Sequence, residues 1–251
     1  SFDAANSTTT FTTTHSGRTI DMNTDAFHNL AFTGSGSWGV TDATLSAHDI
    51  TITAGTLTLP VGTTTVSGSL NNSAGTITNN GSPMVFTATA TSKVINTNGS
   101  SLASMTFTGS GSWAMTDVNV TSLGSVTISD GTVTLPSGVL TVGGDFNNAS
   151  GTVTHNTSEI DFTSNTATIL HANGSDLGGV RFTGTGPYTM TDASLAITED
   201  LTIDSGSVIF ATGTLSLGGS FDGSGGTFAH SSGTILFNSG DTGESIDPGT
   251  S

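Results

Sequence analysis

Short runs in which apolar and polar residues alternate cover most of the chain. Leu30-Ala31-Phe32, Ile50-Thr51-Ile52 and Leu57-Thr58-Leu59 are examples. A period of two places Leu, Ile, Val and Phe on one face of a strand and Thr or Ser on the other. Gly, Asn, Asp and Ser gather between the runs, where turns need them. No segment keeps a 3.6-residue period, so the sequence predicts many short β-strands and almost no helix.

A block of seven residues recurs at a spacing of 75. Phe32-Thr33-Gly34-Ser35-Gly36-Ser37-Trp38 is repeated without change at 107–113, and in altered form at 182–188, where it ends in Tyr188. Four phenylalanines mark a second common phase: Phe11, Phe86, Phe162 and Phe237. The predicted units are approximately 11–85, 86–161 and 162–236, with partial units at 1–10 and 237–251. We expect one continuous domain over residues 1–251, because a fixed period of this kind indicates an array.

Two all-β architectures fit these units. One is a parallel β-solenoid, or β-helix, in which each unit makes about three or four coils. The other is a row of small β-sandwiches, one for each unit. Units of 75 residues with so few large side chains would make marginal independent domains, whereas stacked coils share one core. The solenoid is therefore the expected fold.

Composition and charge exclude several classes of protein. Gly occurs 34 times and only 9% of residues are charged, yet 33% are hydrophobic, which is more than a disordered chain of this polarity would carry. Three basic residues stand against 19 acidic ones, for a formal charge of −16. Nucleic-acid binding needs a basic surface, so it is not expected. No apolar run is long enough to insert into a membrane. Without cysteine there are no disulfides.

Asp42, Asp117 and Asp192 recur at the period of the repeat and are the candidate metal ligands. Carboxylate oxygens suit Ca²⁺, so a row of these residues would be a weak calcium site. The competing interpretation is a turn aspartate that binds backbone N–H groups. No further acids stand at the spacing of a calcium loop, and the six histidines fall at unrelated phases. We therefore expect no other metal site and no cofactor.

No catalytic motif is visible. The arginines and the lysine stand beside no acidic cluster in the sequence, so the chain is expected not to be an enzyme. A polysaccharide-active β-helix enzyme remains a less favoured alternative. Trp38, Trp113 and Tyr188 would either stack on sugars or pack at a corner of the coil. Thr-x-Thr runs also occur in ice-binding solenoids, but their spacing here is not uniform.

The two ends of the chain fall at the same phase of the repeat. Residues 11–25 match 237–251, and neither stretch reads as a distinct cap. Because an open coil exposes unpaired backbone groups, it can accept another coil. Head-to-tail contacts of this kind do not close, so they generate filaments. The expected partner is a second copy of the chain, and the alternative is that 1–251 is an excerpt of a longer repeat protein. The expected subunit interface contains Phe2, Phe11, Ile20, Phe237 and Ile246.

The complete unit resembles known repeats. Its pattern runs F-x-x-L-x-F-T-G-S-G-S-W, then T-D, L-T-I-x-x-G-T-L-T-L-P, L-T-V-G-G-x-F-N-N. This is similar to the low-complexity β-solenoid repeats of large secreted bacterial and archaeal surface proteins, including adhesins of the filamentous-haemagglutinin kind. The resemblance implies an extracellular or cell-surface location and a structural role. It leaves open an adhesin or carbohydrate-binding stalk, for which glycans would be the partner.

Overall fold

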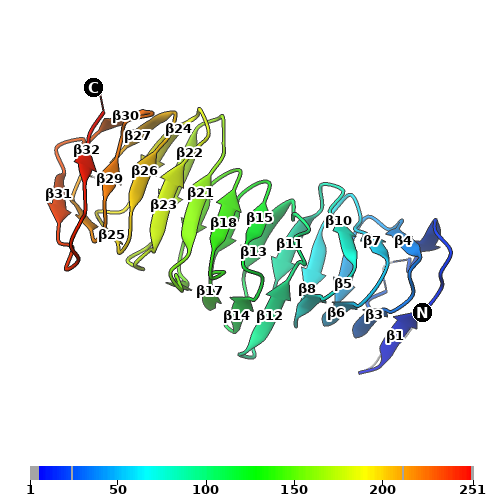
Figure 1. Ribbon diagram of the computed structural model, residues 1–251. Coiled ribbons are helices and arrows are strands. Elements are labelled where there is room, and N and C mark those ends of the chain that lie inside the picture. Colours follow the sequence, from blue (N-terminus) through cyan, green and yellow to red (C-terminus); the bar gives the residue numbers. More distant parts are fainter. Residues whose placement is uncertain (1–5, 24, 211, 250–251) are drawn as a thin grey trace.

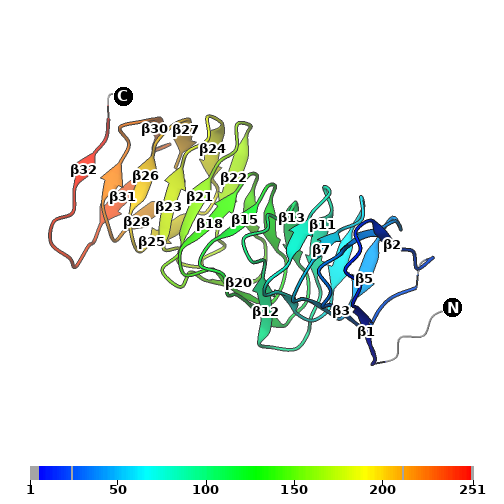
Figure 2. The ribbon, with the colours of Figure 1, turned by 45° about the vertical axis from the view of Figure 1, so that its right-hand side comes forward.

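The computed structural model describes residues 6–23, 25–210 and 212–249, which form an elongated rod of stacked β-coils. The N-terminal strands lie at one end and the C-terminal strands at the other in both views (Figures 1 and 2). The strands form parallel sheets, and the coil makes about 11 circuits without any helix among the described residues. Parallel pairing of successive coils confirms the predicted solenoid and not the row of sandwiches, whose sheets are antiparallel.

Each coil contributes one strand to each of three faces, and one circuit takes about 20 residues, since Asn29 pairs with Asp49. We call each strand, or isolated bridge, a rung. The first face starts with β1 (Thr8–Phe11), β3 (Asn29–Phe32), β6 (Asp49–Ile52), β9 (Leu70–Asn72), β12 (Lys93–Asn96), β14 (Ser112–Met115), β17 (Thr132–Thr134) and β20 (Thr152–Thr154). It ends with β25 (Ser194–Ile197), β28 (Thr214–Leu217) and β31 (Thr234–Phe237).

The other two faces are built in the same way. The second face contains β2 (Arg18–Ile20), β4 (Ser37–Val40), β7 (Thr56–Thr58) and β10 (Thr76–Thr78), then β15 (Val120–Ser122), β18 (Val139–Val142), β21 (Glu159–Phe162), β23 (Gly179–Phe182), β26 (Leu201–Ile203), β29 (Phe221–Asp222) and β32 (Ile246–Asp247). The third face contains β5 (Leu45–Ala47), β8 (Thr64–Val66), β11 (Pro83–Phe86), β13 (Ser104–Phe107), β16 (Val126–Ile128), β19 (Phe146–Asn148), β22 (Thr168–His171), β24 (Pro187–Met190), β27 (Ser207–Ile209) and β30 (Thr227–Ala229).

Two interruptions divide the first and second faces into separate sheets. On the second face, the strand between β10 and β15 is replaced by a loop that ends in the isolated bridge of Leu102 to Ser122. On the first face, a loop between β20 and β25 ends in the bridge of Leu177 to Ile197. Both loops turn at an Asn-Gly pair in which Asn98 or Asn173 has positive φ. Asn and Gly are the residues that tolerate this conformation.

The repeat is out of step with the coil. One unit supplies ten strands and one isolated bridge, which make eleven rungs, or three and two-thirds circuits. Each unit is therefore rotated by a third of a circuit relative to the one before it. Phe32 lies on the first face, Phe107 on the third and Phe182 on the second. After three units the phase returns, so Phe11 and Phe237 both lie on the first face.

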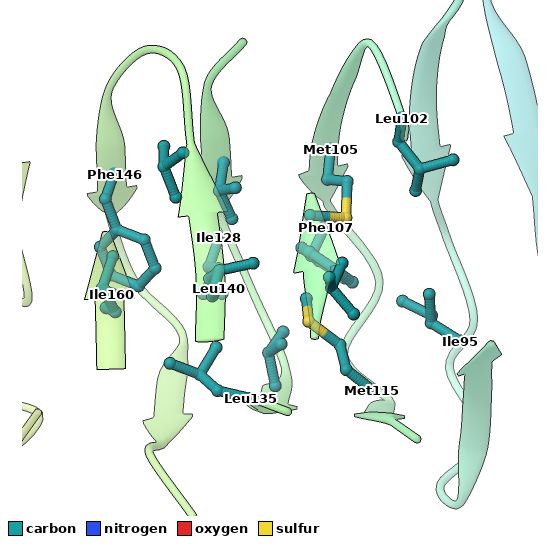
Figure 3. Close-up of a cluster of buried hydrophobic side chains, with 14 of the residues drawn as sticks. Ile95, Leu102, Met105, Phe107, Met115, Ile128, Leu135, Leu140, Phe146 and Ile160 are labelled. Carbon is teal, nitrogen blue, oxygen red and sulfur yellow. The ribbon is translucent and has the colours of Figure 1, made fainter. Parts of the chain in front are cut away.

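The core is a continuous column of inward-pointing side chains. Phenylalanines on successive coils stack with nearly parallel rings, at centroid distances of 4.9 Å for Phe86 and Phe107 and 5.2 Å for Phe162 and Phe182. Figure 3 shows Phe107 with Met105 and Met115 in the same interior. Each coil covers the inward-pointing side chains of the coil before it, and this apolar burial stabilises the stack. The stacking of the phenylalanine rings adds to that stabilisation.

Glycines in the recurring block allow successive coils to approach closely. A Cβ atom at Gly109 would overlap the backbone of Thr87 and Ala88, and one at Gly111 would overlap the carbonyl of Ala90. On the following coil, Gly131 has φ +75° and faces the carbonyl oxygens of both glycines. No larger residue fits this corner, which explains why the block varies so little between units.

Candidate functional site

The three recurring aspartates bind backbone amides of the preceding coil. Asp42 accepts hydrogen bonds from the N–H groups of Met22 and Asn23, at 2.7 and 3.0 Å. Asp192 accepts them from Ala172 and Asn173, both at 2.7 Å. Asp117 makes the equivalent pair of bonds. The carboxylates therefore satisfy backbone donors at a turn that recurs once in each unit, and for Asp117 and Asp192 this turn belongs to an interrupting loop.

The rotation of the repeat separates these aspartates. Asp42 follows β4 on the second face, Asp117 follows β14 on the first and Asp192 follows β24 on the third. They do not form a row, and the described residues contain no group of three acidic or histidine side chains arranged to hold a metal ion. Of the two interpretations of the sequence, the geometry favours the backbone-binding aspartate, although its partners lie one coil away and not in its own turn.

The recurring aromatic residues are part of the core. Trp38, Trp113 and Tyr188 are each at most 2% exposed, and each packs against two phenylalanines of its own unit. Tyr188 donates a hydrogen bond to the carbonyl of Ser164 at 2.6 Å, and its burial raises the pKa of the hydroxyl to about 12. None of the three can serve as a platform for sugar rings in this conformation.

The histidines contribute local contacts and no common site. His28 and His48 stack on adjacent coils with centroids 4.8 Å apart, and His48 Nδ1 lies 3.2 Å from Asp49. His171 Nδ1 lies 3.3 Å from Asp192. A pair of imidazoles without a third ligand does not complete a zinc site.

A charged cluster on the second face was missed by the sequence analysis. Arg181 on β23 donates to Asp204 at 2.6 Å, and Thr183 donates to Asp161 at 2.7 Å. Glu159 lies beside them on β21. Its burial raises the pKa of the carboxyl, the positive charge of Arg181 lowers it, and Asp161 raises it further. The prediction that the arginines and the lysine stand beside no acidic cluster is therefore wrong for Arg181, because neighbours in the coil are about 20 residues apart in the chain.

This cluster occurs once in the described chain, where the end of the second unit meets the third. The residues at the matching positions earlier in the chain are uncharged. They are Thr10 and Val85 for Asp161, Ala31 and Thr106 for Arg181, and Thr53 and Ser129 for Asp204. The Arg181–Asp204 pair is more than a third exposed, so solvent screening limits its contribution to about 1 kcal/mol or less. Asp204 accepts a hydrogen bond from Arg181, and Asp161 accepts one from Thr183. Both aspartates therefore help to hold neighbouring coils together.

Threonine rows form only short patches. Thr56, Thr58, Thr76 and Thr78 occupy two adjacent rungs of the second face, and their equivalents on β17 and β20 lie on the first face. In the third unit Ile209 and Ala229 replace two of these threonines. The rotation thus ends each flat threonine array after two rungs, which argues against an extended ice-binding surface.

The residues expected at the subunit interface lie on the terminal rungs, except Phe2, which is outside the described residues. Phe11 is partly buried and Ile20 is buried, and both line a recess of about 340 Å³ at the N-terminal end. At the other end Phe237 is 41% exposed and Ile246 is 59% exposed. The internal equivalents of Phe237 are Phe86 and Phe162, which are fully buried.

Comparisons with protein-family models, with curated proteins and with solved structures gave no match. Among the described residues no helix is long and apolar enough to cross a membrane. The class of the protein is therefore defined by its fold, a parallel β-solenoid with a 75-residue repeat.

Proposed function

We propose that this chain is a non-enzymatic structural subunit of an extracellular filament, which lengthens when the coil of one copy stacks on that of the next. One observation carries the proposal: the last rungs expose inward-pointing Phe237 and Ile246, although the same column is buried in every internal coil. Fully burying an exposed Phe or Ile side chain gains about 1.5–3 kcal/mol, and because these two are already about half buried, covering the rest gains about half of that for each. The backbone groups of the end rungs would pair in the same contact.

The contact would join different ends of two copies, so it would repeat without closing. The interior column would then run without a break from one subunit into the next. The extracellular location rests on the resemblance to secreted surface repeats. The structural role is supported by the three recurring aspartates, because their carboxylates bind backbone amides of the coil.

Light scattering at rising concentration, followed by electron microscopy, tests this function. We expect long unbranched fibres with a strand spacing of about 4.7–4.8 Å along the axis. Phe237→Asp with Ile246→Asp should prevent growth. Val61→Asp is the matched control, because Val61 is 77% exposed on the side of the rod. A stable monomer of the unmodified 25.0 kDa chain at all concentrations would overturn the proposal.

An adhesive or glycan-binding stalk is a second candidate, and two adjoining recesses favour it. They lie on the first face beside the loop of Asp176, have volumes of about 310 and 270 Å³, and share Ala196 and Ser216. Screening against immobilised oligosaccharides tests this role. Binding of a sugar that is lost in the Ala196→Trp variant would support this role. If no sugar binds, the role is contradicted.

A further inference from the structure

The rotation of the repeat assigns one register to the contact between subunits. Resting on the filament function above, we propose that β31 of one copy pairs with β1 of the next, and β32 with β2. Three units return the phase to the starting face, so β31 and β1 both belong to the first face and β32 and β2 to the second. The occupant of the N-terminal recess is then the last coil of a second copy.

The inward columns match in this register. Phe237 points inward, because its partner on β28 is the buried Leu217, and Phe11 points inward opposite Phe32. Stacking Phe11 on Phe237 would extend the column of parallel rings, since Phe11 and Phe32 already stack at 5.0 Å and 10°. On the second face Ile246 would meet Ile20 in the same way.

Charge complementarity marks the same register. Arg18 stands two residues before Ile20, and Glu244 stands two residues before Ile246. Aligning the isoleucines therefore places the guanidinium beside the carboxylate. Both side chains are exposed within a single copy, and Glu244 receives only the hydroxyl of Ser220 at 2.6 Å among the bonds of the described residues. Arg18 is one of only three basic residues in the chain.

Pro248 also fits this contact. It occupies the repeat position of Met22, Thr97 and Ala172, whose N–H groups bind an aspartate of the following coil. In the proposed register the coil that follows Pro248 is the first coil of the next copy, and the residue aligned with Pro248 is Met22 of that copy, which is not an aspartate. Proline has no N–H group, so no donor would be left without a partner there.

Charge reversal tests the register. Arg18→Glu and Glu244→Arg should each abolish the increase in light scattering that accompanies polymerisation. The chain that carries both changes should polymerise again. Lys93→Glu is the matched control, because Lys93 is the repeat equivalent of Arg18 inside the solenoid, and it should polymerise normally. If the single reversals polymerise like the unmodified chain, or the double reversal does not recover, the register is wrong although the filament stands. If the unmodified chain never associates, both proposals fail.

Cysteine cross-linking provides a second readout in a chain that has no cysteine of its own. Thr10 on β1 and Leu236 on β31 point outward on the first face and become neighbours in the proposed contact. Mixed Thr10→Cys and Leu236→Cys chains should form covalent dimers on oxidation. Ala229→Cys lies on the third face and should not react with Thr10→Cys. Preferential cross-linking through Ala229→Cys would show a rotated contact and overturn the assignment.

Discussion

The Oδ2 atom of Asp192 accepts a hydrogen bond from the N–H group of Ala172, one coil earlier and 2.7 Å away. The same carboxylate binds the next amide through its other oxygen, so one side chain satisfies two donors where the chain leaves the sheet. Asp192 is 5% exposed, so the bond from Ala172 forms away from bulk water, whereas the bond from Asn173 is only partly buried.

Replacing Asp192 by Ala should lower the stability of the coil by about 1–3 kcal/mol, because the buried amide of Ala172 and the partly buried amide of Asn173 lose their acceptor. Urea unfolding monitored by circular dichroism measures the loss. Asp176→Ala, a change at an exposed residue of the same loop, is the control and should shift the midpoint little. Added Ca²⁺ should leave the unmodified midpoint in place. A calcium-dependent rise that disappears in Asp192→Ala would show that the carboxylate binds the ion.

Gly109→Ala should destabilise the chain by about 3 kcal/mol, since the new methyl group would overlap the carbonyl of Ala88 and push two coils apart. Gly39→Ala is a matched control, because nothing lies within 4 Å of its Cβ position and the repeat equivalent is Ala114. Thermal unfolding compares the two. Equal midpoints would mean that the corner can relax, contrary to the explanation given for the glycines of the recurring block.

Tyr188 is the only tyrosine, so its ionisation can be followed by ultraviolet absorbance. Burial raises the pKa of the hydroxyl from about 10 to about 12, which means that the folded state holds the proton more tightly than the unfolded state. The stabilisation is complete below pH 10 and is lost as the pH rises towards 12. The folded chain should titrate later than the chain in denaturant. Coincident titration curves would contradict the burial of this residue.

Trp38 and Trp113 should emit at short wavelength and resist quenching by acrylamide, because both indole rings lie in the core. Oligosaccharides should leave this emission unchanged. Unfolding in urea serves as the control and should restore quenching. A change of emission on addition of sugar would revive the aromatic platform that the burial argues against.

The alternation of apolar residues and the 75-residue period were enough to predict the all-β solenoid. They were not enough to predict which side chains meet, because contacts depend on the length of one circuit. Asp161 and Arg181 lie 20 residues apart and look unrelated in the sequence, yet they are neighbours on the second face. Likewise, the partners of Asp192 lie 19 and 20 residues earlier.

The burial of the aromatic residues was also ambiguous in the sequence. Trp38 has polar and glycine neighbours in the chain, so its environment comes from other coils. Phe11 and Phe32 supply part of it, one from the preceding coil and one from the same block. A spacing of 20 between like residues, such as Phe162 and Phe182, was the signal that could have revealed the circuit length.

The displacement of the repeat by a third of a circuit has a mechanical consequence. Each interrupting loop replaces one strand by an isolated bridge and so makes a local weak point on its face, and the second and third units place this point on different sides of the rod. The two weak points therefore lie on different faces and at different heights of the rod, and the third face forms one continuous sheet from β5 to β30. Because no face carries both interruptions, the rod should have no single side along which it bends most easily at every height.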